Sequence, residues 1–504
     1  MSPRVLRFTA LLLATAAVAF ARPFMIVVYN VENLVDADGQ ALFDDYGAPR
    51  YTPAHLLTKL QNISSVLAKF ENGRGPDVIL FQEFEDDLTP ARRPIDYAAI
   101  LRHYSHTTIE QMLGPKFDPA IADLPAEALL AKAMADRGMT GYHIVVAENP
   151  TPSGGRRTLA QVCVVFTRFP VLETRSHATV DARAILEVKI DVEGHPLHLF
   201  NNHWKSGASD PGTEKIRIEN ARTLRTRLDQ LLKADPNVDV VIGGDLNSQY
   251  NQRVRYRRTM DVTGVNDVLG SQGNELAIRG PARDLYNLWH ELPAADRGSD
   301  TFRGQWGTLM HLLLTRGLYD YRGVQYIDNS FGVAKLAGLN VDDKGLPRRW
   351  SFAGPAGGGF SDHFPLYAKF TTVRDNRPGD YISLRNASDE ASETASAAAA
   401  PMIDYAAVDL AKAAALTDSI PDSVSIRTPD YLGKVFRVEG VVGKAKRLTV
   451  RFRGEIYDVW TYDAALREQL REKFKTGDPI RFYGELGLFK QRWQFVVRDP
   501  SWVK

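Results

Sequence analysis

Residues 238–247 read VDVVIGGDLN, a short apolar run that ends in two glycines, an aspartate and an asparagine. Such a run, bounded by turn residues, is typical of a buried central strand. Similar apolar runs begin at Phe24 and Val78, and amphipathic stretches lie between the runs. Residues 216–232, for example, have the spacing of a helix with one apolar side. This alternation predicts an α/β domain that extends to Phe370.

The composition limits the class of protein. The chain has 504 residues, a net charge of +1, 44% hydrophobic and 24% charged residues, which is globular and too long for one ordinary domain. The only long apolar run lies at the N-terminus, which excludes a polytopic membrane protein. A single cysteine, Cys163, excludes an intramolecular disulfide and a zinc site built on several thiolates. Any metal would be held by oxygen or imidazole.

Residues 1–21 have the pattern of a signal peptide. Arg4 and Arg7 precede an apolar run, and Ala19-Phe20-Ala21 is a small-residue cleavage site. We therefore expect an exported protein, periplasmic or secreted, with no transmembrane segment in the mature chain. A single membrane anchor is the alternative, which the short apolar run and the lack of a stop-transfer flank disfavour.

The last quarter of the chain changes pattern twice. Residues 373–430 are rich in serine, alanine and acidic residues, which predicts a partly disordered linker, with one short helix near 405–416. Residues 431–504 then show five short alternating strands with glycine punctuation and a helical stretch at 464–474. Five strands and one helix in so short a segment predict a small β-barrel of the OB type.

Polar residues follow several predicted strands. They are Asn30, Glu32, Glu83, Asn202, His203, Asp245 and Asn247, and a late turn adds Asp362 and His363. A lone aspartate or asparagine after a strand is usually a turn residue or a helix cap. In α/β folds, however, ligands bind beyond the carboxyl ends of the strands, so these side chains are expected to converge on one face.

Five segments, in this order, resemble the endonuclease/exonuclease/phosphatase superfamily, the deoxyribonuclease I-like fold. The segments are Asn30–Leu34, Gln82–Glu83, Asn202–Ser206, Gly244–Asn247 and Ser361–Pro365. The resemblance implies a four-layer α/β sandwich over residues 22–372, with two packed β-sheets and helices outside. It also implies hydrolysis of phosphodiester or phosphomonoester bonds with Mg²⁺, or with Mn²⁺ or Ca²⁺.

The resemblance also implies a role for each residue. The implied metal ligands are Glu83, Asn30, Glu32 and Asp362. The implied catalytic residues are Asp245 and Asn247, which orient the water and phosphate, and His203 and His363, which donate to phosphoryl oxygens. The implied substrate-binding residues are Asn202 and Lys205. Attack on a phosphate independently requires a hard cation, a positioned water and hydrogen-bond donors.

Two positions depart from the family pattern. Met310 stands where relatives commonly have an aspartate that orients the last histidine, and Gln161 stands where many have an acidic residue that pairs with the other. Glutamine can hold an imidazole but cannot stabilise its charge, and methionine can do neither. Asp300, Asp284 and Glu110 are the candidates for a substitute carboxylate. Phosphate binding is therefore a firmer expectation than fast hydrolysis.

Charge distribution bears on the substrate. Residues 431–504 carry 16 Lys or Arg against 9 Asp or Glu, a net +7; with +2 on residues 1–21, the total of +1 leaves −8 for residues 22–430. A basic barrel beside an acidic body suggests a polyanionic ligand, and Arg451, Arg453 and Trp493 are expected to bind single-stranded nucleic acid. The alternatives are a solvated basic face over an aromatic core, or a sugar or peptide ligand.

The sequence thus predicts an exported, metal-dependent phosphodiesterase, foremost a nuclease. One alternative is a phosphatase or phospholipase-like enzyme acting on inositol phosphate or phospholipid headgroups. Another is a phosphate-binding protein of the same fold with impaired catalysis. The expected partner is nucleic acid or another phosphate ester, and the sequence gives no sign of a stable protein partner.

Overall fold

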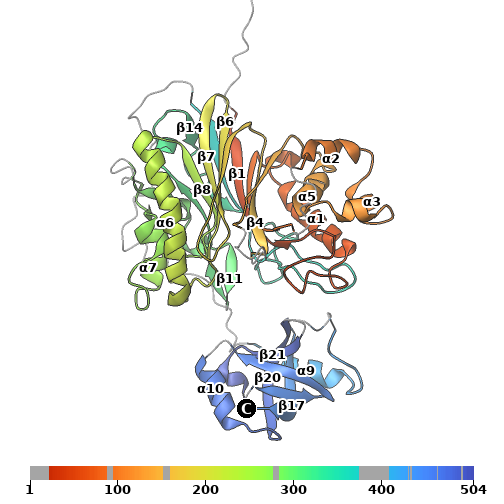
Figure 1. Cartoon of the computed structure of the whole chain (residues 1–504). Coiled ribbons are helices and arrows are strands. Elements are labelled where there is room, and N and C mark those ends of the chain that lie inside the picture. The colour runs from red at the N-terminus through yellow and green to blue at the C-terminus, as the bar shows by residue number, and fades with distance from the viewer. Residues whose placement is uncertain are drawn as a thin grey trace, which may run out of the picture.

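The computed structural model describes residues 22–87, 95–150, 159–275, 278, 283–302, 304–373, 408–428, 431, 434–445, 447–461, 464–489 and 492–503. These residues form a sandwich of two β-sheets flanked by helices, and a small closed barrel (Figure 1). The expected signal peptide and most of the expected linker lie outside the described residues. Of the helices in the described ranges, none is long and apolar enough to cross a membrane.

The first sheet has the strand order β14-β16-β1-β2-β4-β3, and β15 pairs with β16. Its strands are β1 (Phe24–Leu34), β2 (Val78–Glu85), β3 (His143–Val146), β4 (Gln161–Thr167), β14 (Val324–Tyr326), β15 (Gly332–Val333) and β16 (Leu366–Thr372). β1 and β2 run parallel with Asn30 opposite Gln82. The polar residues that end both strands therefore lie at the same edge of this sheet.

The second sheet has the order β5-β6-β7-β8-β13-β10-β9. Its strands are β5 (Val171–His177), β6 (Ile185–Val192), β7 (His195–His203), β8 (Val240–Asp245), β9 (Ser271–Gln272), β10 (Leu285–Asn287) and β13 (Met310–Leu314). Here β7 and β8 run parallel with His203 opposite Asp245. A separate two-stranded sheet consists of β11 (Asp300–Phe302) and β12 (Gln305–Gly307).

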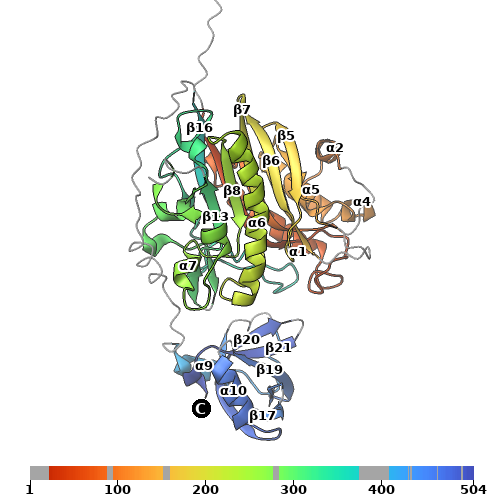
Figure 2. The ribbon, with the colours of Figure 1, turned by 60° about the vertical axis from the view of Figure 1, so that its left-hand side comes forward.

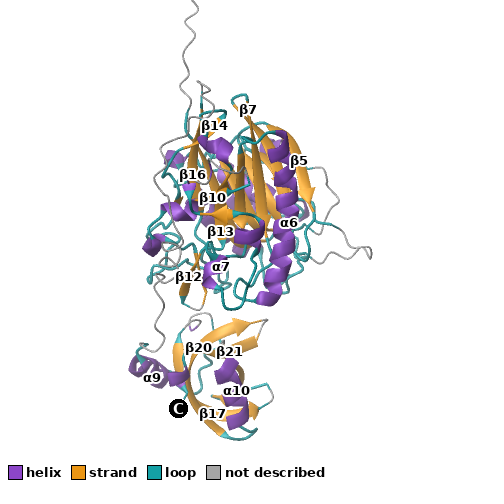
Figure 3. Cartoon of the chain, turned by 90° about the vertical axis from the view of Figure 1, so that its left-hand side faces the viewer, coloured by secondary structure: helices purple, strands orange, loops and turns teal. Residues whose placement is uncertain are grey.

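Helices cover the outer face of each sheet. α1 (Pro53–Leu67) and α5 (Ala126–Ala135) contact the first sheet, and α2 (Tyr97–His103) and α3 (Ile109–Met112) pack against α5; α4 (Pro119–Ala122) precedes α5 in the chain. On the side of the second sheet lie α6 (Pro211–Ala234) and α7 (Gln252–Arg255) (Figure 1). α6 begins where the Asp210 side chain accepts a hydrogen bond from the Gly212 N–H, with Pro211 in the first turn. Figure 2 shows α6 in front of the second sheet, and Figure 3 shows the same layering with helices in purple. The four-layer sandwich is confirmed.

Shorter helical turns connect these elements. They are η1 (Glu71–Gly73), η3 (Gly264–Val268), η5 (Leu288–Glu291), η6 (Ala294–Asp296) and η7 (Arg316–Tyr319) in the sandwich, and η10 (Pro500–Trp502) after the barrel.

Strand β1 is apolar on both faces because each face packs in a different apolar layer. Met25, Val27 and Tyr29 pack with the helices outside the first sheet. The alternate residues, among them Ile26 and Val28, pack in the layer between the two sheets. Because successive side chains of a strand point to opposite faces, a strand covered on both sides must be apolar throughout.

Two glycines in β8 let the sheets and strands approach closely. A Cβ on Gly243 would lie 2.5 Å from a methyl carbon of Leu80 in the facing sheet. A Cβ on Gly244, which has φ +123°, would lie 2.1 Å from the backbone oxygen of Asn202. Both glycines therefore set the position of Asp245, the next residue in the chain.

The C-terminal part is a closed barrel with the order β17-β18-β19-β21-β20. Its strands are β17 (Val435–Lys444), β18 (Thr449–Phe452), β19 (Glu455–Thr461), β20 (Pro479–Phe489) and β21 (Arg492–Val497), and α10 (Ala464–Lys473) lies between β19 and β20. The strands, the helix and the closure match the expected small barrel.

Residues ahead of the barrel form α9 (Leu410–Ser419), which contacts β17. Ile420 and Ile426, which follow α9, belong to the hydrophobic core of the barrel. The sequence assigned residues up to Asp430 to a linker because the alanine-rich composition hides these few apolar contacts. The structure corrects that boundary: residues 408–428 pack with the barrel.

Candidate active site

Side chains from both sheets meet at one end of the sandwich. The Asn30 amide (Nδ2), at the end of β1, donates to Glu83 Oε1 and to Asp245 Oδ2, each at 3.1 Å. Glu83 lies in the neighbouring strand of the first sheet, whereas Asp245 ends β8 in the second. The structure therefore brings together three residues that the sequence predicted to converge, and Asn30 links the two sheets.

Two imidazoles flank Asp245. His203 Nε2 lies 3.7 Å from Glu83 Oε1 and 3.9 Å from Asp245 Oδ2, and His363 Nε2 lies 3.8 Å from the same Asp245 oxygen. The Nδ1 atom of each ring is buried without a hydrogen-bond partner. Both rings thus present Nε2 toward one shared position beside Asp245, where a substrate oxygen could bind.

The turn that carries His363 is fixed to β1. The hydroxyl of Ser361 donates to the backbone oxygen of Asn30 at 2.6 Å and accepts from the His363 N–H at 3.1 Å. Asp362, between them, places its Oδ1 3.7 Å from His363 Nε2. The late motif and the first motif of the sequence are therefore adjacent in space.

Backbone strain gathers at these strand ends. Glu32, Asn33, Glu83 and Asn247 all have positive φ, between 48° and 67°, although none is glycine. Such conformations cost free energy and tend to occur at functional sites. At Asn247 the strained turn directs the backbone N–H to Asp245 Oδ1 at 2.8 Å, while its side-chain amide donates to the Trp204 carbonyl at 3.0 Å. The Asn247 N–H thus holds Asp245 Oδ1, and the Asn30 amide holds Asp245 Oδ2.

The carboxylates in this cluster repel one another. Burial, and then the charge of Asp362, raise the pKa of Glu83. The same two causes raise the pKa of Glu32 to about 7. A divalent cation held by Glu83 and Asp362 would offset this repulsion, and a set of partly buried oxygen donors suits a hard ion such as Mg²⁺. The donor set therefore fits the implied metal.

Glu32, another expected ligand, already has protein partners. Arg349 Nη2 donates to Glu32 Oε1 at 3.0 Å, and the Trp350 N–H donates to Glu32 Oε2 at 2.8 Å. The same guanidinium reaches Asp362 Oδ2 at 3.3 Å. Lys59 supports the Glu32 backbone by donating to its carbonyl at 2.6 Å. Glu32 is thus tied to cations of the protein, which leaves Glu83 as the central carboxylate.

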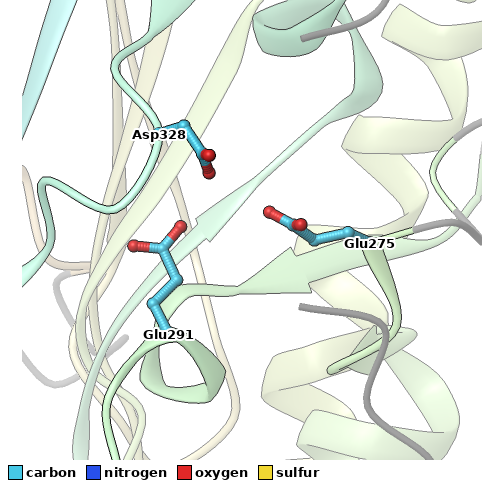
Figure 4. A group of neighbouring side chains, drawn as sticks. All are labelled: Glu275, Glu291 and Asp328. Carbon is cyan, nitrogen blue, oxygen red and sulfur yellow. The ribbon is translucent and has the colours of Figure 1, made fainter. Parts of the chain in front are cut away.

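A second acidic group lies apart from this cluster. Ligand oxygens of Glu275, Glu291 and Asp328 lie within 4.8 Å of one another (Figure 4). Burial raises the pKa of Glu291 to about 8, and Tyr326 donates to its Oε2 at 2.5 Å. A proton on Glu291 therefore relieves the repulsion in this group at neutral pH, and no strand end that carries the expected site contributes to it.

Of the three candidate substitutes for the absent carboxylate, Asp300 is the one whose charge acts on His363. Its backbone pairs with that of His363 in an antiparallel bridge. Burial alone would lower the pKa of His363, but Asp362, Asp245 and Asp300 outweigh it and raise that pKa to about 9. The other two candidates lie elsewhere: Asp284 neighbours Arg225 and Arg283, and Glu110 accepts from Gln61 on the surface.

Arg183, just before β6, is a residue that the sequence analysis missed. It donates to Gln161 Oε1, and Gln161 in turn donates to Asn33. Its charge helps to hold down the pKa of Glu83 and, after burial, is the next cause that keeps the pKa of His203 well below its usual value. Gln161 therefore positions an arginine at the site. Arg183 does not follow a strand, so the pattern used to find the other residues could not reveal it.

Two residues of the sandwich, Asn202 and Lys205, are predicted to bind substrate. Asn202 is fully buried, and its amide donates to the carbonyls of Phe200 and Gly243, so the structure corrects its assignment to substrate binding. Lys205 is half-buried directly after Trp204, close to the end of β7, and its role stays a prediction.

In the barrel, Arg453 donates to the carbonyls of Thr417 and Pro421, and half-buried Trp493 packs against the hydrophobic core. Arg453 is thus engaged in building the barrel, which corrects its assignment to strand binding, whereas the binding role of Trp493 stays a prediction. Arg451 is exposed on β18, and its binding role stays a prediction.

Residues 142–372 match a family model described as "Endonuclease/Exonuclease/phosphatase family". Among solved structures, truncated TDP2 from Caenorhabditis elegans is 14% identical, with 69% of this chain and 98% of that chain covered and a TM-score of 0.37. A protein of the same family from Leptotrichia buccalis is 12% identical, with 69% and 99% covered and a TM-score of 0.39. The human Nocturnin catalytic domain with bound sulfate is 13% identical, with 70% and 94% covered and a TM-score of 0.35. No curated protein matches the sequence.

Proposed function

We propose that this chain is a metal-dependent phosphodiesterase that cleaves nucleic acid, because residues 142–372 match the model of the endonuclease/exonuclease/phosphatase family, whose members are phosphoric ester hydrolases. The observation that carries the proposal is the Asn30 amide, which joins Glu83 and Asp245 across the two sheets at 3.1 Å each. The two imidazoles beside Asp245 complete a site with a base, an oxygen donor set and hydrogen-bond donors.

Each residue has a defined task in this proposal. Glu83 and Asp362 would hold a divalent cation, which would supply Lewis-acid charge to the phosphate. Asp245 accepts the proton of the attacking water, and the N–H of Asn247 and the amide of Asn30 fix its two oxygens for that step. The phosphorus–oxygen bond to the leaving group then breaks as the bond to the water oxygen forms.

The two histidines differ in charge. His363, with its pKa raised to about 9, is cationic at neutral pH and can donate a charge-assisted hydrogen bond to a phosphoryl oxygen. His203, with its pKa held well below the usual value, is neutral and donates without adding charge. Arg183 adds a second permanent cation close to Glu83 and His203. Together these groups stabilise the charge that develops on the phosphate.

Asp300 and Arg183 favour an active enzyme over a phosphate-binding protein without catalysis. Both supply charge near the positions where Met310 and Gln161 carry none. Nucleic acid is the preferred substrate because the basic barrel belongs to the same chain. The pattern of residues 1–21 supports export as part of the same proposal.

The test is hydrolysis of bis-p-nitrophenyl phosphate, single-stranded DNA and RNA, p-nitrophenyl phosphate and inositol phosphates, each with Mg²⁺ and with EDTA. We expect metal-dependent cleavage of the diesters, and loss of that cleavage in Glu83→Gln and Asp245→Asn. Glu85→Gln is the matched control: Glu85 lies on the same strand, and burial raises its pKa to about 8, so glutamine imitates its protonated form. Preference for monoesters would contradict the proposal, as would full activity of Glu83→Gln.

A further inference from the structure

The barrel has a cavity of about 550 Å³ between α10, the strands β19 and β21, and the two residues that precede β18. Its charged and aromatic lining consists of Arg447, Arg467, Arg471, Arg492, Asp458 and Trp460. A volume of this order is typical of small-molecule sites and accommodates a nucleobase with its sugar and phosphate.

Trp460 and Arg467 form a flat platform in this cavity. Trp460 lies on β19 and is 38% exposed, although tryptophan usually buries most of its surface. The guanidinium of Arg467, on α10, lies 4.7 Å from the centre of the indole ring. An exposed aromatic ring beside a planar cation is the arrangement on which unpaired bases stack.

The other arginines give the cavity a surplus of positive charge. Arg447 Nη2 lies 2.6 Å from Asp458 Oδ2, and Arg492 Nε lies 4.0 Å from the same oxygen. One negative charge therefore neutralises two guanidinium charges only in part. Arg471 has its carboxylate neighbour, Glu468, at 3.8 Å and well exposed to solvent. Three cations therefore surround the platform with only partial neutralisation.

Arginines elsewhere in the barrel are engaged in structure. Arg498 makes two hydrogen bonds to Glu485, at 2.8 and 3.0 Å, and Arg437 is 2.6 Å from Asp418. Arg453 is bound to backbone carbonyls. These three arginines are therefore paired within the barrel, whereas Arg447, Arg467, Arg471 and Arg492 line the cavity.

We infer that this cavity binds single-stranded nucleic acid, with a base stacked on Trp460 and phosphates paired with Arg447, Arg471 and Arg492. The inference deepens the proposed function and rests on it, because the strand held here is the substrate presented to the sandwich. An unpaired strand fits better than an acidic peptide, since Asp and Glu side chains supply charge but no aromatic ring to stack on the platform, whereas every nucleotide supplies both.

The test uses the full chain in EDTA, so that binding is measured without cleavage. Fluorescence anisotropy of labelled oligo-dT gives the affinity and its salt dependence. Trp460→Ala is expected to weaken binding about 5- to 150-fold, the effect of losing one base stack. Trp460→Phe should retain most of the affinity, which separates stacking from misfolding. The double variant Arg447→Ala/Arg492→Ala should reduce the salt slope by about 1.4, or about 0.7 for each phosphate that the protein no longer neutralises.

Arg481→Ala is the matched control, because Arg481 lies on β20 outside the cavity, is 63% exposed and is 3.1 Å from Glu439. It should bind oligo-dT like the unaltered protein. Unchanged affinity in a folded Trp460→Ala variant overturns the inference. If poly-glutamate competes with labelled oligo-dT as well as unlabelled oligo-dT does, the inference is also overturned, because the cavity would then bind any polyanion through charge alone.

Two readouts keep this inference distinct from the proposed function. Trp460→Ala should still hydrolyse bis-p-nitrophenyl phosphate, and Glu83→Gln should still bind oligo-dT. If Trp460→Ala weakens binding of oligo-dT but the unaltered protein hydrolyses none of the substrates, the result would contradict the proposed function and leave the inference about the cavity standing. If hydrolysis depends on Glu83 but the affinity for oligo-dT is unchanged in Trp460→Ala, the result would contradict the inference about the cavity and leave the proposed function standing.

Discussion

Asp300 and His363 pair through their backbones in an antiparallel bridge, and the carboxylate of Asp300 helps to raise the pKa of His363 to about 9. Asp300, the first residue of β11, thus adds negative charge beside His363, whereas Met310 adds none. Met310 itself lies fully buried in the apolar layer between the sheets, opposite Asp245 in β8.

Asp300→Asn should lower kcat on bis-p-nitrophenyl phosphate about 10- to 100-fold, the usual effect of removing a partner that supports a site residue. Asparagine keeps the oxygen that accepts from the Leu309 N–H, so the fold should survive. Steady-state kinetics measure the effect, and exposed Asp296 provides the control as Asp296→Asn. An unchanged kcat would show that Asp362 and Asp245 alone maintain His363.

Met310→Asp should destabilise the protein without raising activity. The new carboxylate would replace a buried apolar side chain and enter a layer that offers it no partner, at a cost of about 4 kcal/mol. Urea unfolding at neutral pH measures the loss. A stable variant with a higher kcat would instead indicate that His363 lacks a sufficient carboxylate.

Gln161→Glu should weaken phosphate binding. A glutamate there would pair ionically with Arg183 and neutralise the cation that Gln161 now only orients. The expected result is a rise in KM of about tenfold, equivalent to about 1.4 kcal/mol of lost binding. Arg183→Gln should show a similar change. A KM equal to that of the unaltered protein in both variants would exclude Arg183 from phosphate binding.

Glu187 should govern much of the acid sensitivity of the sandwich. It is buried in β6, which would raise its pKa, but hydrogen bonds from His177, His198 and Arg227 dominate and hold that pKa well below the usual value. Its stabilising effect is therefore present above the unfolded pKa of about 4.3 and is lost as the pH falls below it.

Glu187→Gln should accordingly lower the free energy of unfolding by about 3 to 5 kcal/mol at pH 7 and flatten its decline in acid. Urea unfolding at several pH values measures both effects. Glu173, 50% exposed on the adjacent β5, is the control, and Glu173→Gln should change stability by less than about 0.5 kcal/mol. Parallel pH profiles for Glu187→Gln and the unaltered protein would refute this assignment.

Gly243→Ala should lower both stability and activity. The added Cβ would meet Leu80 at 2.5 Å and Val28 at 2.9 Å, and relief of this overlap costs about 1 to 3 kcal/mol. The displaced β8 would also shift Asp245. Gly358→Ala, where a Cβ meets no atom within 4 Å, should be neutral in thermal unfolding and kinetic assays. Equal behaviour of the two variants would show that the sheets separate without cost.

The sequence predicted the sandwich and the main site residues because strand period and polar strand ends are local signals. Asn30, Glu83, Asp245 and both histidines follow that rule, and parallel pairing then places them together. Arg183 and Asp300 could not be found in this way, since a turn and a backbone bridge bring them to the site. Arg453 was misassigned because a strand pattern does not show that its partner is a distant carbonyl.

The Asn30 amide joins residues of two different sheets, so the catalytic geometry depends on the thickness of the apolar layer beneath it. Substitutions that only change volume in that layer, far from any reacting atom, should then alter turnover. Interior residues such as Val28 and Leu80 therefore offer a route for temperature adaptation of the site, while every polar side chain at the strand ends stays the same.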